Sequence, residues 1–223
     1  EAAVKVFQFE LDQVTLVFMP FAHILGRVAQ FFHITTGYIK CFVESLDKMT
    51  DNMIAVRPHF MVSVPRLLEK MHARILNAAA NLTPRRRRLF DWSISAGLQA
   101  AQKKLKHQRL SFFLWVKNVL AQIFVFHKMR QRLGGRFKFF VCGGAPLSVD
   151  VGLFFYACGI KILEGYGLTE TTAAISVNRH EHIKFGTVGP AIGSIQFKIA
   201  DDGEILVKGP MVFEGYYNDA QSD

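Results

Sequence analysis

The stretch FKFFVCGGAPLSVDVGLFFYACGIKILEGYGLTETT, residues 137–172, carries the pattern that decides the fold. It opens with a short, almost wholly apolar run, which predicts a buried strand. Ser148 can begin a helix that ends near Gly159, and a second apolar run follows at 161–164. A strand–helix–strand unit of this length joins parallel strands, so the sequence predicts an α/β fold with parallel βαβ layers.

The same alternation extends toward the N-terminus. Short apolar runs closed by proline or glycine predict strands, and longer amphipathic segments between them predict helices. Pro65 suits the first turn of one of these helices, because that turn leaves its backbone N–H groups unpaired in any case. We expect strands at 14–18, 38–43 and 59–64, and helices at 22–36, 47–55 and 65–80.

The pattern changes after residue 186. The segments 194–200 and 204–208 flank Asp201-Asp202-Gly203, a turn sequence typical of a β-hairpin. We therefore expect an antiparallel β segment at the C-terminal end of the chain.

Two long helical patterns interrupt the α/β alternation between residues 83 and 135. Thr83 and Pro84 form a helix start, with the threonine as cap and the proline in the first turn. The second helix is expected at 111–132 and ends before Gly134-Gly135. One apolar stripe is expected on the first helix, formed by Leu89, Trp92, Ala96 and Ala100. The sequence thus predicts a helical hairpin inserted into the α/β domain.

Two glycine-bearing loops, at 143–146 and 165–172, follow the two strands of the central unit. Ligands of α/β proteins bind at the carboxyl ends of parallel strands, and small residues let the backbone approach a ligand closely. Tyr166 offers a flat ring for a purine, Thr169 a hydroxyl for a phosphate oxygen, and Glu170 an oxygen ligand for Mg²⁺. Taken alone, each loop could equally be a tight turn with a structural tyrosine and a capping threonine.

Several motifs, in this order, resemble those of the AMP-forming, adenylate-forming acyl-CoA synthetase family. The central one is GYGLTET at 165–171, preceded by FVCGGAPL at 140–147 and MPFAH at 19–23. The segment RRRRLFDW at 85–92 is similar to the start of the helical insertion in the long-chain fatty acid branch. Downstream matches are GTVGP at 186–190 and short glycine-containing segments at 203–205, 209–210 and 215–217. The chain therefore resembles an internal part of the family's large N-terminal AMP-binding domain.

The resemblance implies three parts within this domain. Residues 83–135 would be the helical insertion, 136–185 the nucleotide-binding βαβ unit, and 186–223 the start of a β-rich subdomain. The family's phosphate loop, ribose-binding aspartate and C-terminal domain with its lysine are not among these 223 residues. We therefore expect the 223-residue chain to show no turnover by itself.

The resemblance also implies roles for individual residues. Thr169 and Glu170 would be the catalytic pair, because Thr169 would bind the α-phosphate and Glu170 would hold the Mg²⁺ that bridges the ATP phosphates. His23 would lie near the substrate carboxylate at the mouth of the acyl site. Together with Thr169, the nucleotide would be bound by Gly143, Gly144, Ala145, Glu164, Gly165, Tyr166 and Gly167.

The implied reaction activates a long-chain fatty acid in two steps. The carboxylate attacks the α-phosphorus of ATP and releases pyrophosphate, and the thiol of coenzyme A then attacks the acyl-adenylate. Because two anions meet in the first step, a metal ion and hydrogen-bond donors must offset the charge. ATP, Mg²⁺ and coenzyme A as co-substrate are therefore expected. Two alternatives stay open: an adenylation domain that serves a carrier protein or a reductase, and a non-catalytic membrane-associated module.

The charge distribution bears on the partners. The net charge is +9, and residues 85–109 contain eight Lys/Arg and a single acid, Asp91. A basic helical hairpin of this kind suits anionic lipid, so we expect peripheral membrane contact. No nucleic-acid-binding motif accompanies it, which argues against nucleic acid as a partner. Three cysteines without metal-type spacing favour a reducing, cytoplasmic compartment.

Two weaker candidates are interpreted as structural. His180 and His182 would face the same way only on a strand, so a surface loop is the better interpretation than a metal site. Cys142 is interpreted as a buried thiol that only packs, and not as a nucleophile.

Overall fold

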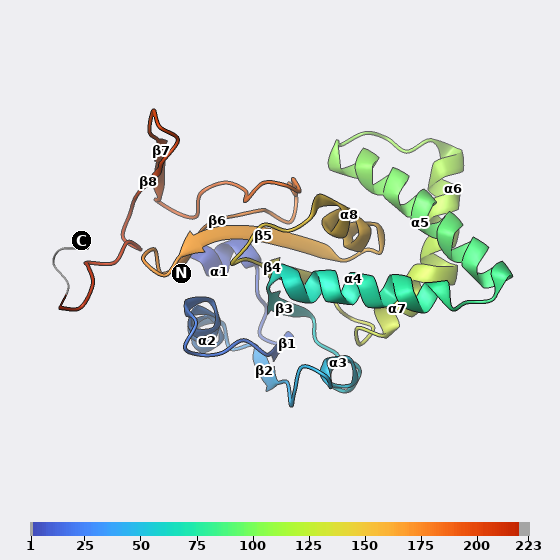
Figure 1. Cartoon of the computed structure of the whole chain (residues 1–223), viewed down its shortest axis with the longest axis horizontal. Helices are drawn as coiled ribbons and strands as arrows, with labels where there is room; N and C mark the ends of the chain where they lie inside the picture. The colour runs from blue at the N-terminus through green and yellow to red at the C-terminus, as the bar shows by residue number, and fades with distance from the viewer. Residues whose placement is uncertain (1, 219–223) are drawn as a thin grey trace.

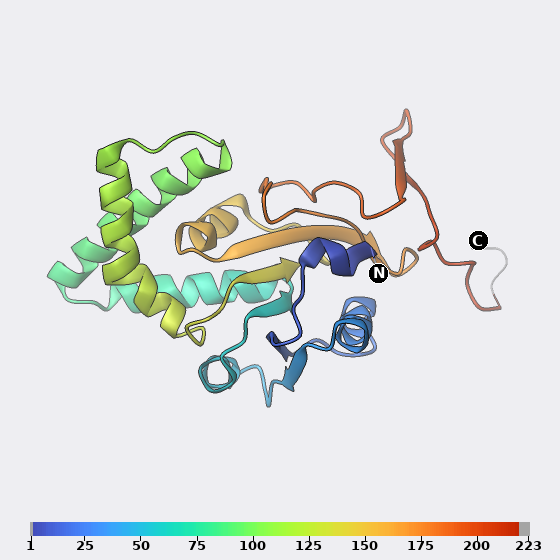
Figure 2. The ribbon, with the colours of Figure 1, turned by 180° about the vertical axis from the view of Figure 1, so that it is seen from behind.

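The computed structural model describes residues 2–218 and forms three layers, with a central sheet between helices and loops (Figure 1, and from behind in Figure 2). Within these residues the main sheet has six strands, in the order β2-β1-β3-β4-β5-β6. The strands are β1 (Val14–Val17), β2 (Ile39–Phe42), β3 (Phe60–Ser63), β4 (Phe139–Cys142), β5 (Lys161–Leu168) and β6 (Ala173–Val177). All neighbouring pairs are parallel except β5 with β6. The predicted α/β class with parallel βαβ layers is confirmed.

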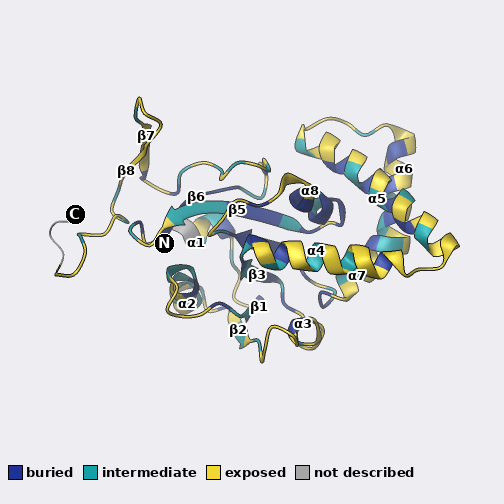
Figure 3. Ribbon diagram, viewed as in Figure 1, coloured by how far each residue is buried: buried dark blue, intermediate teal, exposed yellow. Residues whose placement is uncertain are grey.

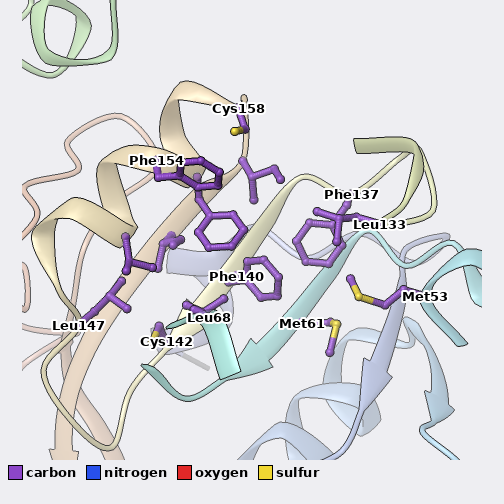
Figure 4. Packing of buried hydrophobic residues seen from close by; sticks show 14 of the residues in the cluster. Met53, Met61, Leu68, Leu133, Phe137, Phe140, Cys142, Leu147, Phe154 and Cys158 are labelled. Carbon is purple, nitrogen blue, oxygen red and sulfur yellow. The ribbon is translucent and has the colours of Figure 1, made fainter. Parts of the chain in front are cut away.

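Helices cover both faces of the sheet, because successive strand residues point to opposite faces and both sets are apolar. These helices are α1 (Ala2–Phe7), α2 (Ile24–Thr36), α3 (Met49–Val56), α4 (Pro65–Ala80) and α8 (Val149–Ala157). Met61 and Phe140 pack with α3, α4 and α8 in the larger core cluster, part of which Figure 4 shows. Phe60 and Val141 point the other way, into a second cluster with α1 and α2. The strand ends that precede the glycine loops are therefore held by a hydrophobic cluster on each face of the sheet.

Helix α2 has defined ends that set its place beside the sheet. The His23 side chain accepts a hydrogen bond from the backbone N–H of Leu25 at 3.2 Å and so caps the first turn. Gly37 ends the helix with φ +75°, a left-handed conformation that glycine adopts without strain. The predicted end of this helix at Gly37 is thus confirmed.

The segment 83–135 is helical as predicted, and the apolar stripe expected on its first helix is largely confirmed. It contains α5 (Pro84–Leu105), α6 (Phe112–Ala121), the π-helical η1 (Gln122–Phe126) and α7 (His127–Gln131). Ala96 and Ala100 are buried and Trp92 packs against the larger core cluster, whereas Leu89 is 40% exposed and its neighbour Phe90 is buried instead. A Cβ added at Gly97 would lie 2.8 Å from the Phe126 ring. Close approach of η1 therefore adds Gly97 to the buried face of α5, beside the positions that hydrophobicity predicted.

The GYGLTET stretch differs most from its prediction. Residues 165–168, which we expected in a loop, continue β5 and pair with β6 in the antiparallel direction. Strand β6 itself was not predicted. Glycines in this stretch look like turn signals, but a register shift between Tyr166 and Gly167 absorbs them as a bulge.

Among the smaller predictions, one is confirmed and others are wrong. The C-terminal hairpin is confirmed as β7 (Gln196–Ile199) and β8 (Ile205–Lys208). Thr83 and Ser148 precede α5 and α8, but the predicted caps are wrong because neither side chain makes a capping hydrogen bond. Helix α1 was not predicted.

Of the segment assigned to the β-rich subdomain, residues 219–223 lie outside the described residues. Among residues 2–218, no helix has both the length and the apolar character needed to cross a bilayer.

Candidate functional site

The two glycine segments lie side by side where β4 ends. The parallel pairing of β4 with β5 places Cys142 beside Glu164, so the residues that follow them, Gly143 and Gly165, lie at the same level along the sheet. A Cβ added at Gly143 would lie 3.3 Å from the carbonyl oxygen of Gly165, so larger residues would force the two backbones apart. Gly144 has φ +88°, which favours glycine. The backbones of the two segments predicted to bind the nucleotide thus lie close together, with no side chain between Gly143 and Gly165. We call this the backbone-lined contact.

Glu164 lies buried beneath this contact. Its side chain is 7% exposed, and burial raises the pKa of its carboxyl group, partly offset by the backbone N–H groups of Gly186 and Leu147. Within the described residues, its Oε1 atom has no hydrogen-bond partner. A buried acceptor without a partner is unfavourable, so this atom suits a donor supplied by a ligand. Glu164 therefore has one oxygen atom, Oε1, that is available to accept a hydrogen bond from a ligand such as a purine.

Tyr166 and Gly167 lie on the antiparallel extension of β5. Tyr166 is half-buried against the second core cluster, so part of its ring is used for packing. A Cβ added at Gly167 would lie 1.6 Å from the carbonyl oxygen of Ala173, which no side chain can tolerate. The bulge therefore requires glycine for steric reasons that the sequence pattern did not reveal.

The turn between β5 and β6 presents Thr169 and Glu170 at its tip. Inside the turn, the Thr171 hydroxyl accepts from the backbone N–H of Leu168 at 2.8 Å and lies 3.1 Å from the carbonyl of Ala173, to which it can donate. Ala173 has a positive φ of +78°, a strained conformation that often marks functional sites when the surroundings enforce it. Thr171 was not among the predicted residues, because a hydroxyl that closes a turn has no distinct sequence signal.

The segment around residue 213 packs onto this turn and holds Glu170. The backbone N–H of Phe213 donates to the Glu170 carbonyl at 2.8 Å, and the Tyr216 hydroxyl donates to the Glu170 carboxylate at 2.7 Å. The second bond lowers the pKa of Glu170, so its carboxylate is ionised near neutral pH. The turn therefore presents a fixed anionic oxygen ligand of the type that Mg²⁺ prefers.

The structure corrects the expected position of the second loop. Thr169 lies four residues beyond Gly165 on an extended strand, which corresponds to about 13 Å at a rise of ~3.3 Å per residue. Thr169 and Glu170 therefore follow the antiparallel extension and do not directly follow a parallel strand end. A single ligand that contacts both Gly144 and Glu170 must be elongated.

A largely apolar pocket of about 240 Å³ opens between α2 and the sheet. Thirteen residues from several separate segments line it: Phe7, Phe9, Leu25, Val28, Ala29, Phe31, Phe32, Val62, Val141, Thr172, Ala173, Ala174 and Met211. Leu25 joins this pocket to the glycine segments, because its Cδ2 atom would lie 3.8 Å from a Cβ at Gly143. The pocket and the backbone-lined contact are thus adjacent parts of one site.

His23 lies at the start of the helix that lines this pocket. It is exposed, and its Nδ1 atom is occupied by the capping hydrogen bond to Leu25. The structure thus gives His23 a structural use at the N-terminal end of α2, near but not inside the pocket lining.

The two weaker candidates behave as structural residues. Among the described residues, no group of three His, Cys, Asp or Glu side chains could hold a metal ion. His180 packs edge-on against the Phe139 ring, with centroids 4.7 Å apart. Burial raises the pKa of the Cys142 thiol to about 12, so it stays protonated and is a poor nucleophile.

Comparisons with known proteins bear on the family and the fold. The family model described as "AMP-binding enzyme" matches residues 2–217. Long-chain-fatty-acid–CoA ligase FadD15 of Mycobacterium bovis is 33% identical over 217 residues, which cover 93% of this chain and 34% of that protein. The peroxisomal long chain acyl-CoA synthetase 6 of Arabidopsis thaliana is 32% identical over 228 residues, covering 95% of this chain and 31% of that protein. The chain spans about a third of the length of these relatives.

Solved structures show the same fold at lower identity. A Mycobacterium tuberculosis fatty acyl CoA synthetase superposes with a TM-score of 0.64 at 16% identity, over 99% of this chain and 36% of that one. O-succinylbenzoate coenzyme A synthetase from Bacillus subtilis, solved with ATP and magnesium ion, gives 0.62 at 17% identity, over 97% of this chain and 37% of that one. These matches support the fold alone.

Proposed function

This chain belongs to the AMP-binding enzyme family, and we propose that the full-length gene product activates a long-chain fatty acid to acyl-AMP and then to acyl-CoA. The observation that carries the proposal is the contact of Leu25 with both parts of the site: it lines the apolar pocket and packs beside Gly143. An acyl chain in the pocket would thus have its carboxylate directed toward the glycine segments. The two relatives named above are a long-chain-fatty-acid–CoA ligase and a long chain acyl-CoA synthetase, which supports this proposal.

The proposed residue roles follow the path of an elongated nucleotide. Gly143, Gly144 and Ala145 would face the purine and sugar on one side, with Gly165, Tyr166 and Gly167 on the other. The free Oε1 of Glu164 would accept a hydrogen bond from the purine. Thr169 would then donate its hydroxyl to the α-phosphate, and His23 would border the carboxylate end of the acyl site.

Glu170 would hold Mg²⁺, since its carboxylate is fixed by Tyr216 and remains ionised near neutral pH. When bound, this ion would offset the negative charge of the ATP phosphates. The chain's own contribution is to position the two reactants, because attack of one anion on another depends mainly on placement and charge compensation.

The test is a pair of assays on the full-length gene product. Palmitate should stimulate exchange of pyrophosphate into ATP, and added coenzyme A should convert this into steady release of AMP and acyl-CoA. Palmitate-dependent exchange without any acceptance by coenzyme A would favour the alternative of an adenylation domain that serves a carrier protein or reductase. Absence of both ATP binding and exchange would overturn the proposal and favour a non-catalytic module.

Replacing Val28 by Trp should shift the preference toward shorter acyl chains. Val28 lines the apolar pocket, and an indole ring there would fill much of its 240 Å³. We expect kcat/KM for palmitate to fall by about tenfold relative to octanoate, as one filled segment of a hydrophobic pocket typically discriminates. Arg27→Trp is the matched control, because Arg27 is the exposed neighbour on α2. An unchanged ratio in Val28→Trp would remove the pocket from the acyl site.

We further propose that the helical insertion contacts an anionic membrane surface peripherally, as a protein of the cytoplasm. Phe112, Phe113 and Trp115 on α6 are 71%, 77% and 52% exposed. On α5, the helix that packs against α6, Arg85, Arg86 and Arg88 are exposed in the first turns, whereas Arg87 forms an ion pair with Asp91. Exposed aromatic and basic side chains together are typical of helices that lie at a lipid interface.

Replacing Arg85, Arg86 and Arg88 by Gln should weaken binding to anionic vesicles by on the order of 100-fold, at about 1 kcal/mol for each charge. Arg87→Gln is the control and should have a smaller effect, because Asp91 already compensates that charge. Sedimentation with vesicles that contain phosphatidylserine would measure the change. Equal binding of the triple variant and the unmodified protein would exclude this contact.

A further inference from the structure

A second cavity, of about 180 Å³, lies among α5, α6 with η1, and the C-terminal end of α8. It shares no lining residue with the apolar pocket. Six of its lining residues carry the argument: Gly97, Lys104, Asn118, Gln122, Tyr156 and Lys161. Small residues of α5 leave the space open, and polar side chains line it from three helices and from β5.

Asn118 is the observation that points to a ligand. It lines the cavity from α6 and is 7% exposed, and its side-chain amide makes no hydrogen bond to another of the described residues. Its neighbour one turn on, Gln122, is bonded on both sides, to the Ala157 carbonyl at 3.0 Å and to Arg130 at 2.6 Å. Asn118 is not among the buried polar atoms that lack a partner, so its amide keeps some access to the cavity and is available to a ligand there.

The charges around the cavity are all positive. Lys104 and Lys161 line it, and within residues 2–218 neither forms an ion pair with a carboxylate. Lys161 donates to the backbone carbonyl of His180 at 3.0 Å, which fixes its position without neutralising it. The guanidinium of Arg130 lies against Gly159 at the cavity wall and donates to the Cys158 carbonyl. None of the lining side chains is acidic.

The backbone geometry of α6 and η1 places these groups. Asn118 and Gln122 are four residues apart and so share one face. The π-helical turn begins at Gln122 and ends with the buried Phe126, which packs against Gly97. Such turns are rare and are frequently found at functional sites. Here the turn allows the polar face to meet α8 while Phe126 still packs on α5.

We propose that this cavity binds a small phosphate-type anion, of the size of inorganic phosphate or pyrophosphate. The lysines supply the charge, and the Asn118 amide and Tyr156 hydroxyl supply donors to its oxygens. The volume equals about six water molecules at ~30 Å³ each, which is too small for a whole nucleotide or coenzyme A. Binding would tie the C-terminal end of α8 to the helical insertion, whereas the glycine loop precedes the N-terminal end of α8.

The experiment is isothermal titration of the full-length protein with pyrophosphate and with phosphate at constant ionic strength, and with ATP as a separate titration. Lys104→Gln and Asn118→Leu should each weaken pyrophosphate binding at this site at least tenfold and leave ATP affinity unchanged. Lys103→Gln is the matched control, since Lys103 is the exposed neighbour on α5 that does not line the cavity. It should behave like the unmodified protein.

Asn118→Leu also gives a thermal readout. The melting temperature of the ligand-free variant should stay close to that of the unmodified protein, whereas the increase caused by the anion should be lost. Pyrophosphate binding that is equal in all variants, or lost only in Glu170→Gln, would assign the anion to the nucleotide site and overturn the proposal. No binding of either anion in the unmodified protein would overturn it as well, without bearing on the proposed ligase activity.

Discussion

Replacing Glu170 by Gln should reduce the rate of fatty acid adenylation by the full-length protein by about two orders of magnitude or more, since one charged ligand to a metal on the reacting phosphates is removed. Gln has the same shape and still accepts the hydrogen bond of Tyr216, which lies 2.7 Å from the carboxylate. The backbone bond from Phe213 to Glu170 is unaffected. The turn should therefore persist, and the loss should lie in charge alone.

Palmitate-dependent pyrophosphate exchange as a function of Mg²⁺ concentration is the appropriate measurement. In Glu170→Gln, half-maximal rate should require more Mg²⁺, whereas the melting temperature should change little. Glu214→Gln is the control, because Glu214 is an exposed carboxylate on the segment that packs onto the same turn. If Glu170→Gln retains both the rate and the Mg²⁺ dependence of the unmodified protein, Glu170 is not the metal ligand.

The parallel part of the sheet could be predicted because its signals are local. Each of β1 to β5 contains a short, mostly apolar run, and proline or glycine follows several of these runs. Strand β6 could not be found in this way, because its pairing depends on a bulge at Gly167 that only the folded chain reveals. The buried face of α5 was predicted in part: Ala96 and Ala100 are buried as expected, Leu89 is not, and the close approach of Phe126 to Gly97 could not be seen in the hydrophobic pattern.

The candidate site could likewise be predicted only in part. The sequence placed Gly143 and Gly165 near each other, because both follow neighbouring parallel strands, and the structure places them in near contact. It did not reveal the distance from there to Thr169, because the extension of β5 looked like a loop. The apolar pocket could not be predicted at all, since its lining combines α2 with residues near 7, 62, 141, 173 and 211.

Replacing Gly167 by Ala should destabilise the fold by about 3 kcal/mol or more, the upper range for overpacking, because a backbone atom and not a flexible side chain blocks the new methyl group. The methyl carbon would lie 1.6 Å from the Ala173 carbonyl oxygen and 2.5 Å from the carbonyl carbon. Since Ala173 already holds a strained φ of +78°, it has little freedom to move away. The strands must separate, which would also displace Thr169 and Glu170.

Gly203→Ala separates this steric effect from the general cost of replacing a glycine. Gly203 has φ +90° in the β7–β8 turn, but a Cβ there would meet nothing within 4 Å. It should cost only about 1 kcal/mol, from the left-handed backbone conformation. Urea unfolding followed by circular dichroism would compare the two variants, and pyrophosphate exchange would report the turn. If Gly167→Ala is no less stable than Gly203→Ala, residues 165–168 do not form the antiparallel extension, and the position assigned to the Thr169–Glu170 turn is wrong as well.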